Sequence, residues 1–187
     1  MKKLLFTRDS IEIQAISQLI AKQKHRTLVL WTIDCAERLL PIFEKKYPQD
    51  KRPRAAVIAA KDWTQGKIKM PLAKQATLAS HRATTAVVAK DPAACAVARS
   101  MGHVVGTVHV ETHALGVVIY GLTALVYDNK QKDIAKLVAK ECAWFYRRLL
   151  YWQNNINRVK ITWAPFLLRD DVPNKEVFLR QKLKRSC

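Results

Sequence analysis

The stretch that decides the fold covers residues 92–127 and reads PAACAVARSMGHVVGTVHVETHALGVVIYGLTALVY. Only two of its 36 residues, Arg99 and Glu111, carry a charge, which is typical of the most buried part of a globular protein. An unbroken helix of this length is unusual in a compact domain, so we expect two helices with a break in residues 110–114. The stretch therefore predicts a buried helical hairpin at the centre of the molecule.

The flanking segments also have apolar residues at helical spacing. The 187-residue chain holds only 5 glycines and 7 prolines, a composition that disfavours an all-β fold. Asp9 and Glu12 have the spacing of a capping box, Asp91-Pro92 is a typical helix start, and Gly66 is placed to end a helix. We expect an all-α, single-domain bundle of about seven helices at residues 9–24, 26–47, 53–66, 71–90, two within 92–127, and 130–152.

The last 35 residues differ from the rest of the chain. They contain two prolines, Pro165 and Pro173, a stretch that favours β-structure, RVKITW, and a basic end, LRQKLKRSC. We therefore expect a helical domain over residues 1–152 and a C-terminal extension over residues 153–187. The extension is predicted to be an arm with a short final helix or a partly disordered tail.

Several features favour a cytoplasmic location. The opening MKKLLF is followed at once by Arg8 and Asp9, so no apolar segment of a secretory signal is expected. The longest uncharged apolar run, residues 114–127, is 14 residues long, which predicts a buried core helix and no membrane span. Four cysteines without a CxxC pair favour buried thiols in a reducing compartment: Cys35, Cys95, Cys142 and Cys187.

The chain is strongly basic, with 33 Lys and Arg against 15 Asp and Glu and a net charge of +18. Such a charge attracts acidic partners, whether protein, nucleic acid or anionic lipid. The excess is spread along the chain with no dense basic block, which is more typical of a solvated cationic surface than of a dedicated nucleic-acid site. The sequence has no helix-turn-helix signature and no RNA-binding aromatic motif.

Three of the five histidines, His103, His109 and His113, lie within eleven residues, and they allow three interpretations: metal ligands, acid–base groups, or polar lining where helices pack closely. A helical wheel favours the third, because small residues and imidazoles share one stripe. The members of this stripe are Cys95, Ala98, Gly102, Gly106, His109, His113 and Tyr120.

A metal site is the less favoured alternative for the histidines. His109 and His113 are four residues apart and can share a metal, but Val110 stands where a zinc protease needs glutamate. A third ligand would have to come from elsewhere in the chain: His81, Cys35, Asp34 or Glu37. No GxSxG, P-loop or GxGxxG pattern supports a hydrolase or a nucleotide-binding function.

A second polar set lies on the helix expected at residues 26–47. Asp34 and Arg38 are an i, i+4 pair, and Glu37 lies on nearly the same face beside Trp31. Paired carboxylates can perform acid–base chemistry, although carboxylates near arginine are more often simply charge-compensated. Cationic and aromatic partners are available at Arg52, Arg54 and Trp63.

Several pieces of the chain, taken in order, resemble the immunity-protein-5-like family of bacterial immunity proteins. The pieces are LWTIDCAERLLPIFEKKYPQDKRPRAAVIAAKDWTQGKI (30–68), ASHRAT (79–84), AACAVARSMGHVVGTVHVETHALGVVIYG (93–121) and, more weakly, KECAWFYRRL (140–149). The residues at the family's motif positions are Trp31, Asp34, Glu37, Asp50, Arg52, Pro53, Trp63, His81, Gly102, His103, His109 and His113. The chain departs from the family in its high positive charge and in its C-terminal extension.

The resemblance implies an all-α antidote to a toxin used in bacterial competition. We therefore predict a non-catalytic protein, without a cofactor, that binds and neutralises a cognate toxin with an acidic surface. Two alternatives remain: a basic nucleic-acid-binding helical protein, or a small helical metal protein or enzyme that uses His81, His109 and His113.

Overall fold

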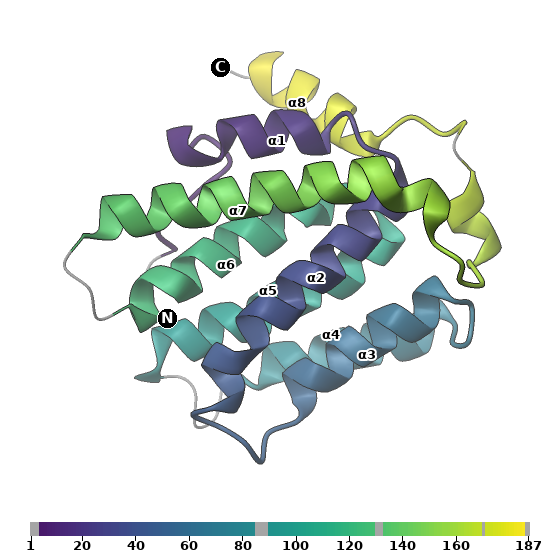
Figure 1. Cartoon of the computed structure of the whole chain (residues 1–187). Coiled ribbons are helices and arrows are strands. Elements are labelled where there is room, and N and C mark those ends of the chain that lie inside the picture. The colour runs from purple at the N-terminus through teal and green to yellow at the C-terminus, as the bar shows by residue number, and fades with distance from the viewer. Residues whose placement is uncertain (1–3, 85–89, 130–132, 170, 186–187) are drawn as a thin grey trace.

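The computed structural model describes residues 4–84, 90–129, 133–169 and 171–185, and these residues confirm the all-α fold class (Figure 1). They contain no strand and eight α-helices, the eighth of which lies in the C-terminal segment. The helices are α1 (Gln14–Ile20), α2 (His25–Glu44), α3 (Arg52–Thr64), α4 (Met70–Arg82), α5 (Pro92–His109), α6 (Ala114–Asp128), α7 (Ile134–Asn155) and α8 (Lys175–Arg185). Short 3-10 segments are η1 (Ile11–Ile13), η3 (Glu111–His113), η4 (Ile156–Arg158) and η5 (Pro165–Leu168).

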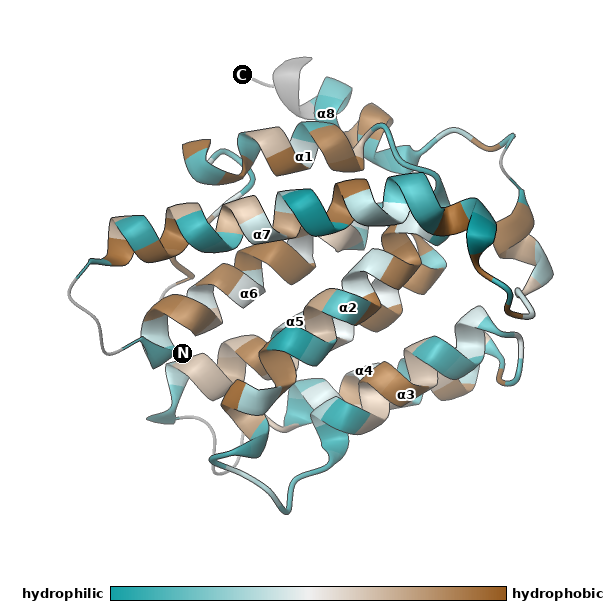
Figure 2. Ribbon diagram, in the orientation of Figure 1, coloured by the Kyte–Doolittle hydropathy of each residue, from teal (hydrophilic) through white to brown (hydrophobic). Residues whose placement is uncertain are grey.

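The hairpin of α5 and α6 forms the centre of the bundle, as predicted. The chain breaks at Val110, whose extended backbone (φ −154°, ψ 138°) ends α5, and η3 then leads into α6. Helix α5 packs against α2, α3, α4 and α6, so it is covered on most sides. Figure 2 shows the apolar character of α5 and α6 beside the more hydrophilic ribbon of α7. The nearly chargeless stretch therefore forms the core because its neighbours bury it.

Two of the three helix-end signals predicted from the sequence are confirmed by the structure. The Asp91 carboxylate accepts a hydrogen bond of 3.0 Å from the Ala94 N–H at the start of α5. Gly66 (φ 72°) follows the end of α3, where a left-handed backbone lets the next N–H reach back to the Asp62 carbonyl. The capping box expected at Asp9 is wrong, because the Ser10 hydroxyl accepts from the Thr7 N–H and no side chain caps η1.

Helix α2 lies between the central hairpin and the outer helix α7. The fully buried Trp31 donates its indole N–H to the Phe145 carbonyl at 3.1 Å and so joins α2 to α7. Pro41 lies in the last turn of α2, which ends three residues later at Glu44. Proline lacks an N–H and crowds the preceding turn, which explains why the helix ends soon after Pro41.

The C-terminal segment after α7 lies against the bundle. The Ala164 N–H donates to the Thr64 carbonyl at 2.8 Å, and the side chain of Leu167 is 1% exposed. Helix α8 lies beside α1, where Arg180 donates to the Ser17 hydroxyl (Figure 1). Residues 158–163 form no strand despite their β-favouring composition. The domain boundary at residue 152 stays a prediction.

None of the described helices combines the length and the apolar character needed to cross a membrane, and residues 114–127 lie within the buried core helix α6.

Cys35, Cys95 and Cys142 are free thiols, and burial raises their pKa values. Cys187 lies outside the described residues.

Candidate functional site

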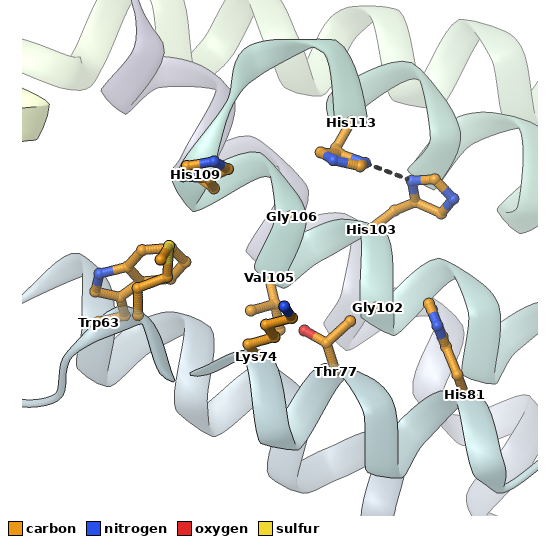
Figure 3. Close-up of a pocket in the computed structure, with 11 residues that line it drawn as sticks. Trp63, Lys74, Thr77, His81, Gly102, His103, Val105, Gly106, His109 and His113 are labelled. Atoms are coloured by element: carbon orange, nitrogen blue, oxygen red, sulfur yellow. Dashed lines mark hydrogen bonds between the residues drawn. The ribbon is translucent and has the colours of Figure 1, made fainter. Parts of the chain in front are cut away.

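A cavity of about 360 Å³ lies between α4 and α5 and contains Trp63 and the four histidines singled out from the sequence (Figure 3). One stripe of α4 forms one wall at helical spacing, and one stripe of α5 forms the other. The lining residues are Trp63, Met70, Lys74, Thr77, His81, Gly102, His103, Val105, Gly106, His109 and His113. Met70 and Lys74 are exposed, so the cavity opens to solvent. We call it the α4–α5 cavity.

Three imidazoles occupy space that three glycines leave free. A methyl group on Gly102 would lie 2.0 Å from His81 Nε2, one on Gly106 would lie 2.7 Å from His113 Cγ, and one on Gly116 would lie 2.3 Å from His103 Nδ1. Carbon atoms need more than about 3 Å from such neighbours, so no other residue fits at these glycines without movement. The histidines therefore pack on helix backbones, as the interpretation of a close helix seam predicted.

His103, in the middle of α5, and His113, in η3, form a direct pair in the lining of the cavity. Their Nδ1 atoms are 3.2 Å apart (Figure 3), so one ring must donate a proton and the other must accept it. The ring of His103 also stacks on Tyr120, with centroids 5.1 Å apart. This geometry requires at least one neutral ring, because two imidazolium rings would have no acceptor nitrogen.

The surroundings keep the buried imidazoles neutral. Burial, supported by nearby positive groups that include His113 and Arg8, lowers the pKa of His103 to about 4. Burial and the charge of Arg99 lower the pKa of His81, and burial with His109 and Arg8 lowers that of His113. At neutral pH these rings offer one donor and one acceptor each and no net charge.

The end of the cavity at the last turn of α5 is aromatic. The rings of Trp63 and His109 are nearly parallel, with an interplanar angle of 16° and centroids 6.2 Å apart. Phe166 from the C-terminal segment packs on Trp63 at 5.8 Å. His109 itself is exposed, so the expectation that all three clustered imidazoles turn inward is wrong for this residue. It lies in the last turn of α5, where the bundle no longer covers the helix.

The described residues contain no group of three or more His, Cys, Asp or Glu side chains that could hold a metal ion. His81, His109 and His113 line one cavity, but each ring has a different neighbour: Gly102, Trp63 and His103, respectively. Glu111 is buried outside the cavity lining, and its carboxylate lies 3.6 Å from His25 Nδ1 on α2. In this arrangement each of these side chains packs against, or hydrogen-bonds to, a different neighbour.

The acidic and arginine residues predicted as a second cluster lie outside the cavity lining. Asp34 accepts hydrogen bonds from Arg148 and Trp152 on α7, so it does not pair with Arg38 as its i, i+4 spacing predicted. Arg38 forms a bidentate pair with the buried Glu141. Both contacts join α2 to α7, with the carboxylate on α2 in the first and on α7 in the second.

The remaining members of that cluster form charge pairs around α3. Glu37 accepts from Arg54 and Lys61, both at 2.6 Å, and these contacts lower its pKa against the effect of burial. Arg52 binds Asp50 in a bidentate pair that lowers the pKa of the carboxylate. The structure thus brings Trp63 and the histidines together and leaves Trp31, Asp34, Glu37, Asp50 and Arg52 in separate structural contacts.

Sequence reasoning missed the α4 wall, although a signal was present. Met70, Lys74, Thr77 and His81 follow spacings of four, three and four residues, which places them on one helical stripe. The sequence pattern did not predict a site on this helix, because only His81 of these residues is of a type that is typical of functional sites. The cavity arises where the stripe faces the two glycines of α5, and sequence spacing does not show which helices face each other.

The fold and the cavity define a small helical-bundle protein with an imidazole-lined cavity. The family model "Imm-5 like putative immunity protein" matches residues 18–151, and the chain belongs to this family. The matched region runs from α1 to α7 and includes every residue of the cavity. No curated protein and no solved structure gives a significant match to the chain.

Proposed function

We propose that the protein is a non-catalytic immunity protein that binds and neutralises the toxin of its own bacterial system. The observation that carries this proposal is the family match over residues 18–151, which covers the whole central bundle. Neutralisation by binding needs a stable scaffold with an accessible surface, and the buried α5–α6 hairpin provides such a scaffold.

The surface of α3 and α4 is where we propose that the toxin binds. Four large apolar side chains are at least 45% exposed there: Ile58, Met70, Leu72 and Leu78. Clustered exposed apolar side chains are typical of protein-binding surfaces. Three lysines, Lys67, Lys69 and Lys74, are exposed on the same two helices and their connection, so an acidic surface on the toxin would complement this face.

A co-expression experiment tests the proposal. Each candidate toxin encoded beside the gene is expressed with and without this protein, and the mixture is analysed by size-exclusion chromatography. We expect one toxin whose growth inhibition is relieved and which forms a stoichiometric complex. Relief without a complex, or a complex without relief, would contradict neutralisation by binding.

A matched pair of variants tests the proposed surface. Leu72→Asp places a charge at a side chain that is 54% exposed on α4, and Ile134→Asp does the same on α7 at a side chain that is 50% exposed. We expect loss of toxin binding for Leu72→Asp and no change for Ile134→Asp. Equal effects of the two variants would place the interface elsewhere.

A gel-shift assay at physiological salt tests the alternative that the protein binds nucleic acid, because this alternative requires strongly salt-dependent binding.

A further inference from the structure

The α4–α5 cavity has the dimensions and lining of a small-molecule site. Its volume of about 360 Å³ lies within the ~300–1,000 Å³ that ligand pockets occupy. Its surface is mostly apolar with a few polar groups, which is also the usual composition of such pockets. Gly102 and Gly106 also line the cavity, and the rings of His81 and His113 pack over these two glycines.

The shape of the cavity favours a planar ring. Trp63 and His109 present nearly parallel ring faces at one end, and His81 closes the other end (Figure 3). Between them, Thr77 and Val105 supply methyl groups on facing walls. An aromatic ligand gains contact with ring faces and with apolar walls at low cost in conformational freedom.

The charges around the cavity favour an anion. Lys74 stands at the rim, and no described lining residue is acidic. Arg8 and Arg99 are close enough to lower the pKa values of the cavity histidines.

We propose that the α4–α5 cavity binds a small aromatic anion, a planar ring that carries one carboxylate or phosphate group. The ring lies between Trp63 and His81, against Thr77 of α4 and Val105 of α5. The anionic group meets the ammonium of Lys74 at the rim. The proposal does not rest on the proposed toxin complex, because its ligand is a free small molecule. Met70 and Lys74 belong both to the cavity lining and to the proposed toxin surface, so a bound toxin would cover the mouth of the cavity.

An NMR titration with a matched pair of probes tests the proposal. Indole-3-acetate supplies the ring and the carboxylate, and indole-3-acetamide supplies the same ring without the charge. We expect saturable 1:1 binding of indole-3-acetate with a Kd of about 1 mM or tighter, as befits a probe of this size. The amide should bind at least about fivefold more weakly, because a charge-assisted contact is lost. The largest shifts are expected for the backbone N–H groups of Gly102 and Gly106 and for the Trp63 indole.

Three variants connect the binding to the cavity. Lys74→Gln should reduce the affinity for the acetate about fivefold and leave the amide unchanged, whereas Lys136→Gln, an exposed change on α7, should alter neither. Thr77→Leu narrows the cavity and should weaken both probes. If Thr77→Leu does not fold, the lysine pair decides. Any of four results would overturn the proposal: no saturable binding, equal affinity for the two probes, equal effects of the two lysine variants, or chemical-shift changes confined to other surfaces.

Discussion

Replacement of Gly116 by alanine tests the packing of imidazoles on glycines most simply. In the structure, the added methyl carbon would lie 2.3 Å from His103 Nδ1 and 2.6 Å from its Cε1. The ring cannot turn aside freely, because it stacks on Tyr120 and contacts His113. Overpacking of this kind costs about 1–3 kcal/mol, and displacement of the ring also removes a hydrogen bond of about 1 kcal/mol. Alanine regains up to about 1 kcal/mol of helix propensity.

The net expectation for Gly116→Ala is a loss of about 2 kcal/mol in the free energy of unfolding. Urea denaturation followed by circular dichroism measures it, and the melting temperature should fall by about 4–8 °C. The control is the same change in a His103→Ala background, where the methyl group has room. There the alanine should be neutral or stabilising, which gives a coupling free energy of about 2 kcal/mol between the two sites. A neutral Gly116→Ala in the parent protein, or equal losses in both backgrounds, would refute the packing argument.

Three other predictions concern stability. The pKa of His103 is about 4 in the folded protein against an ordinary value of 6.5, so the unfolded chain takes up the proton first as pH falls. The free energy of unfolding should therefore drop by about 2 kcal/mol between pH 6.5 and 4. Denaturation curves at several pH values measure this dependence, and His103→Gln should make it weaker. Trp31→Phe leaves the Phe145 carbonyl without its buried donor and should cost about 1–3 kcal/mol, measured by urea denaturation; a cost below about 0.5 kcal/mol would contradict the role of this bond. Asp34→Ala removes a partly exposed pair with Arg148 and should lower the free energy of unfolding by only about 1 kcal/mol. A loss above about 3 kcal/mol in the same assay would show that Asp34 does more than pair with α7.

The central hairpin was predictable because its signal is local. A long run with two charges must be buried, and a break was expected at residues 110–114 from length alone; the structure places it at Val110. The seam was also predictable in part, since Gly102, Gly106, His109 and His113 share one stripe and line one cavity. The helical wheel, however, says nothing about where the bundle ends, and so it failed for the exposed His109.

Contacts between distant segments were beyond the sequence pattern. His81 packs on Gly102 from another helix, and Asp34 finds its partners on α7 more than a hundred residues later. Local spacing predicted an Asp34–Arg38 pair instead, because spacing describes one helix at a time. The capping box at Asp9 failed for a similar reason: a neighbouring hydroxyl, that of Ser10, formed a competing turn.

The helix seam of the bundle depends on neutral imidazoles that pack on helix backbones, two of which hydrogen-bond to each other. Their ring-nitrogen chemical shifts, recorded at pH 7 by long-range ¹H–¹⁵N NMR of the full chain, test this directly. We predict neutral rings for His81, His103 and His113, with a protonated Nδ1 in one member of the His103–His113 pair and an unprotonated Nδ1 in the other. Imidazolium shifts at these rings, or two protonated Nδ1 atoms in the pair, would contradict the account.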